Sequence, residues 1–173
     1  MNQPVTYERY PLGIVLASNG VSLAILAIGT YVLIRILPWL AAPYLAYALW
    51  IEVRLLSSAC VDCAYYGKAC AFGRGVVSRW FFRKGQPERF ACREIAWTVI
   101  LPDMLVWLIP LAAGAVFLVW TGWDLVLAVL LIALLGLSTF GTGLVRGTLA
   151  CDHCQQRILG CPAHDLFQGG RNE

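Results

Sequence analysis

The sequence IAWTVILPDMLVWLIPLAAGAVFLVW, Ile95–Trp120, continues through Thr121 and Gly122 into WDLVLAVLLIALLGLSTFGTGLV, Trp123–Val145. Each of these apolar runs is long enough to cross the hydrocarbon core of a bilayer, which takes roughly 20 residues of helix. Because only Thr121 and Gly122 separate the runs, they predict two membrane-spanning helices joined as a tight hairpin.

The first half of the chain carries a second pair of apolar runs, Leu12–Leu37 and Trp39–Leu56, with Pro38 alone between them. The Trp39–Leu56 run is the weakest of the four, because Glu52 and Arg54 lie inside it. The chain of 173 residues is 60% hydrophobic and 13% charged, with a mean hydropathy of +0.70. This composition excludes a soluble globular domain. We therefore expect an all-α integral membrane protein with four transmembrane helices arranged as two hairpins.

The basic residues predict the orientation of the hairpins. Of the 13 lysines and arginines, only Arg35 lies near a hairpin tip. The stretch that joins the hairpins and the tail after the last helix contain Arg54, Lys68, Arg74, Arg79, Arg83, Lys84, Arg89, Arg93, Arg146, Arg157 and Arg171. By the positive-inside rule, both termini and the central loop are expected in the cytoplasm, with the helices in the cell (inner) membrane. The segment SRWFFRK, Ser78–Lys84, suits an interface with anionic lipid head groups, and no nucleic-acid binding is expected.

Two cysteine motifs share the spacing Cys-x2-Cys-x6-Cys. They are CVDCAYYGKAC, Cys60–Cys70, and CDHCQQRILGC, Cys151–Cys161. An offset of 91 positions carries Cys60, Cys63 and Cys70 onto Cys151, Cys154 and Cys161, and the same offset carries Pro11 onto Pro102 and Ala59 onto Ala150. The chain therefore reads as two tandem repeats of a hairpin followed by a cysteine motif, residues 1–94 and 95–173. Parallel repeats are related by an axis along the membrane normal, which would bring the motifs face to face.

Clustered cysteines in a reducing compartment indicate metal binding first and redox chemistry second. A Cys-x-x-Cys turn directs two thiolates at one ion, and further ligands complete a tetrahedron. The predicted ligands are Cys60, Cys63, Cys70, Cys151, Cys154 and Cys161. Their doubled spacing resembles that of the fungal binuclear zinc-cluster transcription factors. That resemblance implies that six thiolates can hold two tetrahedral zinc ions when two of them bridge. Ala64-Tyr65-Tyr66 stands where that family has basic residues, so no DNA binding is inferred.

Other residues permit different ligand sets. Cys92 is a candidate fourth ligand for the first motif, and His164 or His153 for the second, which would give two separate four-ligand sites. We expect His153 to lie at the surface, because its neighbour Cys154 already coordinates. Cys92 is equally consistent with a buried free cysteine.

One pair of charged residues is expected inside the bilayer. Asp103 lies eight positions after Ile95, the predicted start of its helix, and Arg54 lies close to the end of Trp39–Leu56. A charge within the membrane normally faces a partner or water. We expect Arg54 and Asp103 to pair and to hold the hairpins together.

Three classes of function remain open from the sequence, and no catalytic residue is assigned. The first is a structural, regulatory or docking site for metal, with zinc as the first choice. The second is an iron–sulfur cluster that transfers electrons beside the bilayer. The third is thiol–disulfide exchange by the Cys-x-x-Cys pairs, which the cytoplasmic placement disfavours. The expected partners are anionic lipids and a soluble cytoplasmic protein or larger membrane complex.

Overall fold

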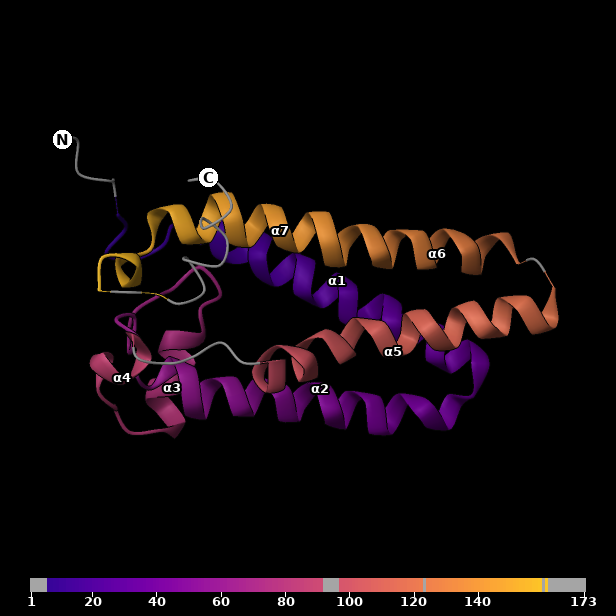
Figure 1. Ribbon diagram of the computed structural model, residues 1–173, viewed down its shortest axis with the longest axis horizontal. Coiled ribbons are helices and arrows are strands. Elements are labelled where there is room, and N and C mark those ends of the chain that lie inside the picture. Colours follow the sequence, from indigo (N-terminus) through magenta and orange to yellow (C-terminus); the bar gives the residue numbers. More distant parts are fainter. Residues whose placement is uncertain (1–5, 92–96, 123, 160, 162–173) are drawn as a thin grey trace. The chain divides into compact units, whose positions relative to one another are not determined.

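The computed structural model describes residues 6–91, 97–122, 124–159 and 161, and every regular element in those ranges is helical (Figure 1). The α-helices are α1 (Leu12–Ile36), α2 (Ala41–Leu55), α3 (Arg74–Phe81), α4 (Pro87–Ala91), α5 (Trp97–Thr121), α6 (Leu125–Gly136) and α7 (Thr142–Leu144). A 3₁₀ turn, Pro38–Leu40, precedes α2, and a π-helical turn, Leu56–Cys60, follows it. The all-α prediction is confirmed.

Within the described ranges, three helical segments are long and apolar enough to cross a membrane: α1, α5 and the continuous run Leu125–His153. They indicate an integral membrane protein. The third segment ends at His153 and not at the predicted Val145, because two π-helical turns, Leu137–Gly141 and Val145–Ala150, continue the helix. α2 is not among the three, because its 15 residues are fewer than a helix needs to cross the hydrocarbon core. The predicted four-span repeat is therefore seen only in part.

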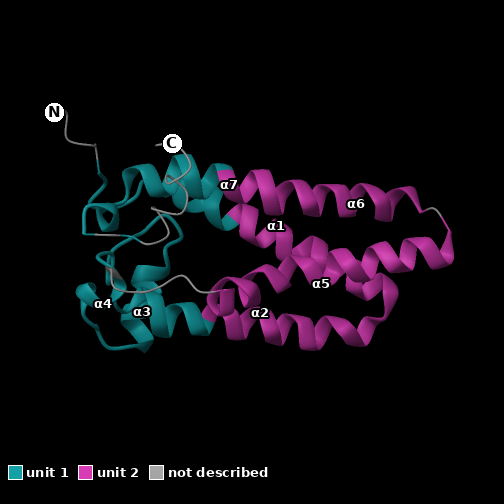
Figure 2. Ribbon diagram, viewed as in Figure 1, with its two compact units in different colours: residues 1–19, 53–96, 144–173 teal, residues 20–52, 97–143 magenta. Residues whose placement is uncertain are grey.

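The chain divides into two compact units, coloured separately in Figure 2. Unit 1 comprises Met1–Asn19, Val53–Ala96 and Leu144–Glu173, and unit 2 comprises Gly20–Glu52 and Trp97–Gly143. Each unit thus draws on both sequence halves. All six cysteines of the two motifs belong to unit 1, and most of the long apolar helices belong to unit 2.

The core of unit 2 forms where α1, α5 and α6 pack together. Val32 of α1 and Leu127 and Leu131 of α6 are buried. Gly114 of α5 faces them, and a Cβ atom at this position would lie 2.6 Å from Leu131 Cδ2 and 2.9 Å from Val32 Cγ1. A small residue here lets three helices approach closely, which is the usual basis of helix packing in membranes.

Pro110 inside α5 removes the backbone N–H that would normally bond to the carbonyl of Val106. Tyr44 of α2 replaces that donor, because its hydroxyl donates to Val106 O at 2.9 Å. Gly29 of α1 makes room for this arrangement: a Cβ atom there would lie 2.5 Å from Tyr44 Oη and 3.0 Å from Pro110 Cγ. In a bilayer, where no water can satisfy a carbonyl, this bond stabilises the packing of α2 on α5.

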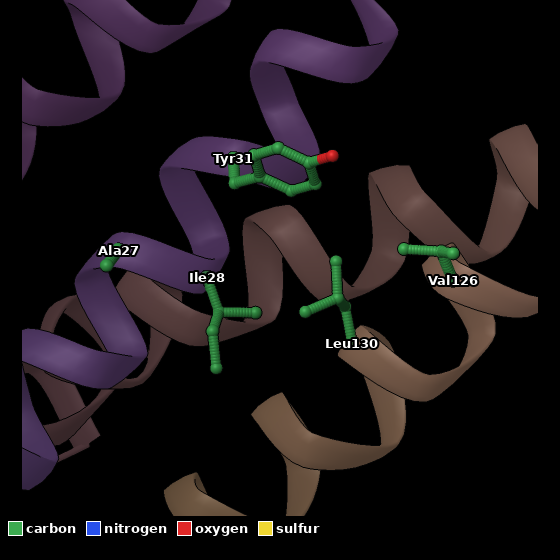
Figure 3. Close-up of a pocket in the computed structure, with 5 residues that line it drawn as sticks. All are labelled: Ala27, Ile28, Tyr31, Val126 and Leu130. Carbon is green, nitrogen blue, oxygen red and sulfur yellow. The ribbon is translucent and has the colours of Figure 1, made fainter.

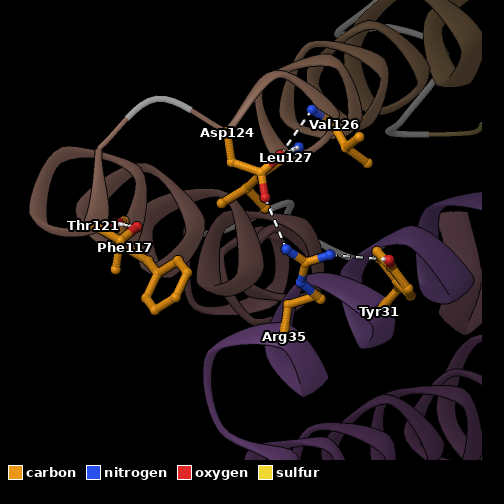
Figure 4. A network of polar contacts seen from close by, with 7 residues as sticks. All are labelled: Tyr31, Arg35, Phe117, Thr121, Asp124, Val126 and Leu127. Carbon is orange, nitrogen blue, oxygen red and sulfur yellow. Dashed lines mark hydrogen bonds and ion pairs between the residues drawn. The ribbon is translucent and has the colours of Figure 1, made fainter.

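The hairpin tips of unit 2 carry one ion pair, drawn in Figure 4. Arg35, near the end of α1, contacts Asp124 Oδ2 at 2.8 Å. Asp124 is also the N-cap of α6, where its other oxygen accepts from the N–H groups of Val126 at 2.9 Å and Leu127 at 3.3 Å. The single basic residue near the tips is thus neutralised by a helix cap.

A shallow apolar groove of about 400 Å³ lies between α1 and α6. Figure 3 shows the side chains that line it: Ala27, Ile28, Tyr31, Val126 and Leu130. The lining is almost entirely hydrocarbon, and the Tyr31 hydroxyl is the one polar side-chain group among these five residues.

We predict that Tyr44→Phe lowers the free energy of unfolding by about 1–3 kcal/mol, because it leaves the buried carbonyl of Val106 without a donor. Unfolding in detergent micelles, followed by far-ultraviolet circular dichroism, measures the change.

Tyr47→Phe is the matched control. The Tyr47 hydroxyl also donates to a carbonyl of α5, Pro102 O, at 2.8 Å. That carbonyl keeps its ordinary helical donor, the N–H of Val106. The loss should therefore be smaller, about 0.6 kcal/mol, as for average hydrogen bonds between membrane helices. Equal losses in both variants would contradict the role given to Tyr44.

Candidate metal centre

Both cysteine motifs begin at the end of a π-helical turn and fold into the same backbone turn. The N–H of Cys63 bonds to Cys60 O at 3.4 Å, and the N–H of Cys154 bonds to Cys151 O at 3.3 Å. The next bond of each turn repeats as well, from Tyr66 N to Cys63 O at 3.0 Å and from Arg157 N to Cys154 O at 3.2 Å. The sequence repeat is therefore also a repeat of local structure.

The two turns meet through a reciprocal pair of hydrogen bonds. The N–H of Ala64 donates to the side-chain Oε1 of Gln156 at 2.9 Å, and the N–H of Gln155 donates to the hydroxyl of Tyr65 at 3.1 Å. The offset of 91 carries Ala64 onto Gln155 and Tyr65 onto Gln156. Matched residues of the two motifs therefore play the same part: one donates its backbone N–H, and the next accepts through its side chain. A local twofold axis between the motifs would produce this arrangement.

The two side chains that make this exchange are almost completely buried. Tyr65 and Gln156 each have an exposed fraction of 1%. Gly75, the second residue of α3, packs directly against the first turn, and a Cβ atom there would overlap the backbone oxygens of Tyr65 and Lys68. The two side chains of the exchange are therefore enclosed by protein, while the bonds that they make to Ala64 and Gln155 are partly buried.

The segment before α1 contacts both motifs. The N–H of Tyr10 bonds to Ala69 O at 3.0 Å, and its hydroxyl donates to Ala150 O. The N–H of Tyr7 bonds to His153 O at 3.1 Å, and the carbonyl of Tyr7 accepts from the Tyr65 hydroxyl at 2.6 Å. The N-terminal segment thus connects the first motif to the second.

Cysteines of both motifs line one buried cluster. Cys63, Cys70 and Cys154 pack against Tyr10, Tyr65, Ala71 and Ala150. The six described cysteines form no disulfide. Among the described residues, no three cysteine, histidine or acidic side chains are placed to hold a metal ion. The backbone therefore brings the thiols into one cluster, and their present side-chain positions are not those of a coordination shell.

Burial raises the pKa of the Cys63 thiol to about 12. The backbone N–H of Tyr65 hydrogen-bonds to the sulfur and opposes this shift, while Cys154, Cys70 and Cys60 add to it through charge repulsion. Burial likewise raises the pKa of Cys154, against the N–H groups of Gln156 and Arg157, with Cys161 and Cys70 adding to it.

These effects repeat with the 91-residue offset, since Tyr65 and Gln156 occupy matched positions. Each sulfur thus has a backbone donor that favours the thiolate, in surroundings that otherwise favour the neutral thiol. A bound cation would supply the missing positive charge and favour the thiolate outright.

The structure describes some of the remaining candidate ligands and charged residues and leaves others outside the described ranges. Cys92 and His164 lie outside the described residues. Arg54 belongs to unit 1 and Asp103 to unit 2, so their pairing stays a prediction. His153 differs from the expectation of a surface residue, because its ring stacks on Tyr7 and its Nδ1 atom is buried.

Sequence reasoning missed the residues that join the motifs. Tyr65 and Gln156 occupy matched positions but differ in type, so a search for identical residues passes over them. Tyr7 and Tyr10 lie outside the motifs altogether. The sequence signal that could have identified Tyr65 and Gln156 is the 91-residue repeat, because it pairs the positions next to the cysteines of the two motifs.

Neither a protein-family model, nor a curated protein, nor a solved structure matches this chain. The function is therefore argued from the geometry of unit 1 and from the chemistry of its thiols.

We predict that Gln156→Leu destabilises the protein by about 0.5–1.5 kcal/mol, because it removes the acceptor of the partly buried N–H of Ala64. Tyr65→Phe should act similarly on the N–H of Gln155. Because both side chains belong to one interface, the double variant should lose less than the sum of the two. Thermal unfolding in detergent measures all three variants.

Gln155→Leu is the control, since the interface uses only the backbone of Gln155. It should change the free energy of unfolding by less than about 0.5 kcal/mol. A loss as large as that of Gln156→Leu, or fully additive losses in the double variant, would contradict a reciprocal interface.

Proposed function

We propose that the two cysteine motifs jointly bind metal, with zinc as the first choice, at the cytoplasmic face of the membrane. The main support for this proposal is the reciprocal pair of hydrogen bonds in which Ala64 bonds to Gln156 and Gln155 bonds to Tyr65. It holds the two Cys-x-x-Cys turns against each other. The metal then acts as a structural clamp between the chain's two halves and forms a docking or regulatory face for a cytoplasmic partner.

The doubled spacing supports this assignment on chemical grounds. Six thiolates can complete two tetrahedra when two of them are shared. Rotation of cysteine side chains between staggered χ1 positions can direct thiols of one cluster toward a common ion. Metal binding displaces the thiol protons, so binding at this site would strengthen as the pH rises.

The thiol environment argues against the exchange of disulfides. A reactive cysteine needs a lowered pKa and access to its partner. Cys63 and Cys154 have raised pKa values because they are buried. An iron–sulfur cluster for electron transfer remains the alternative, because it also uses cysteine thiolates.

We infer a four-span topology, which contacts within unit 1 support. Tyr10 precedes α1, Ala69 follows α2, and their backbones are hydrogen-bonded at 3.0 Å. If α1 crosses the bilayer, the chain must return before Ala69, and α2 is the helix between them. The helical stretch from Pro38 to Cys60 is long enough for this crossing, at roughly 1.5 Å per residue.

The same reasoning applies to the second pair of helices. The Tyr10 hydroxyl bonds to Ala150 O, close to the end of the run Leu125–His153. α5 and that run must therefore cross in opposite directions. Both cysteine motifs then share one side, and the basic residues around them favour the cytoplasm.

Helix α3 supports contact with lipid on that side. Ser78 faces inward and donates to Leu56 O at 3.1 Å, which fixes α3 beside the end of α2. Trp80 and Phe81 have exposed fractions of 75% and 73%. Exposed aromatics flanked by Arg79 and Arg83 suit a helix in the head-group region of an anionic membrane.

The topology predicts opposite labelling of two exposed positions. In intact cells, a membrane-impermeant maleimide should label Trp39→Cys, whose native side chain is 80% exposed in the first hairpin turn. Phe81→Cys should react only in inverted vesicles. The parent protein measures the background from native thiols, and labelling of both positions from one side would exclude the topology.

The metal proposal predicts that protein purified without oxygen contains zinc, measured by elemental analysis, and is colourless. Cys63→Ser and Cys154→Ser should each remove more than half of the metal and lower the melting temperature, because both motifs share the site. Chelation should lower the melting temperature of the parent in the same way.

Cys92→Ser is the control from outside the two motifs and should keep more metal than either variant. Brown protein with iron and sulfide would favour the electron-transfer alternative, and protein without metal would refute the proposal. If Cys63→Ser leaves the second motif with its full metal, the two sites are separate.

A further inference from the structure

His153 has an unusual position within the second Cys-x-x-Cys turn. Its Nδ1 atom is buried and has no hydrogen-bond partner in the described part of the chain. Buried polar atoms in native proteins nearly always have a partner, and an exception calls for an explanation such as an ion. The imidazole of His153 is therefore short of one interaction.

The ring is held in place by the N-terminal segment. It stacks on Tyr7 with 4.9 Å between ring centroids and 20° between planes. The backbone of Tyr7 is itself fixed at both ends, because its N–H bonds to His153 O at 3.1 Å and its carbonyl accepts from Tyr65 at 2.6 Å. These contacts tie the ring to the contact region between the motifs and oppose its rotation into water.

The matched position of the first motif differs in this respect. The offset of 91 carries Asp62 onto His153, and Asp62 has an exposed fraction of 6%. Its Oδ1 accepts from the N–H of Gln86 at 3.0 Å. The chain thus supplies a backbone donor to the buried polar side chain of the first turn, whereas Nδ1 of the second turn receives none.

We propose that Nδ1 of His153 is a nitrogen ligand of the metal, an inference that rests on the proposed function. Imidazole nitrogen is a standard zinc ligand beside thiolate sulfur. Coordination by adjacent residues is no obstacle when two ions are present, because His153 and Cys154 can bind different ions. Two tetrahedral ions need eight bonds, which six thiolates and one imidazole supply when a single thiolate bridges.

The test is X-ray absorption at the zinc edge on protein loaded with zinc alone and purified without a histidine tag. Imidazole gives characteristic outer-shell scattering from its ring carbons, which thiolates do not. The chain has two histidines, His153 and His164. In His164→Phe, the imidazole signal should persist, since only His153 can then supply it.

His153→Phe is the complementary variant, because phenylalanine keeps a ring to stack on Tyr7 and lacks the nitrogen. It should lose the imidazole signal while the sulfur shell remains. If the parent binds zinc through sulfur alone, or the signal disappears in His164→Phe, the ligand inference is wrong while the metal proposal stands. If the parent binds no zinc, the proposed function itself fails.

Discussion

The contact between the two Cys-x-x-Cys turns is the constraint on which the rest of unit 1 depends. Ala64 bonds to Gln156 and Gln155 bonds to Tyr65, so each turn satisfies a backbone donor of the other. Without this exchange, the N–H groups of Ala64 and Gln155 would lose their partners, and the two turns that carry the clustered thiols would lose the hydrogen bonds that join them. Tyr7 and Tyr10 bring the N-terminal segment against the same contact. Unit 1 is thus organised around hydrogen bonds between the repeats.

The membrane helices are subject to a different constraint. Their backbone carbonyls must find hydrogen-bond donors within the protein, because the hydrocarbon core contains no water. Pro110 would leave Val106 O without a donor, and Tyr44 supplies one from the neighbouring helix. Gly29 and Gly114 permit the close approach that this packing requires. The bond from Tyr44 therefore replaces a donor that the sequence removes from a neighbouring helix.

The two constraints are linked by the path of the chain. In the proposed topology, the intervening helices return to the side from which they left, which agrees with the hydrogen bonds that join Tyr10 to Ala69 and Ala150. The even number of crossings in this proposal would place both cysteine motifs on one face of the membrane, where they can meet. The proposed metal would then link the chain's two halves beside the membrane, and the basic residues of the loop and tail would lie next to lipid phosphates.

Much of this protein could be predicted from its sequence. Apolar length predicted α1, α5 and most of Leu125–His153, and the spacing of the cysteines predicted a repeated turn, because both are local properties of the chain. The end of the last helix was missed, since π-helical turns leave the apolar pattern without a clear stop. Only the tertiary structure decided that Tyr65 and Gln156 join the turns and that Nδ1 of His153 is buried. These features depend on which distant segments meet, and hydrogen bonds between unlike residues leave no periodic pattern in the sequence.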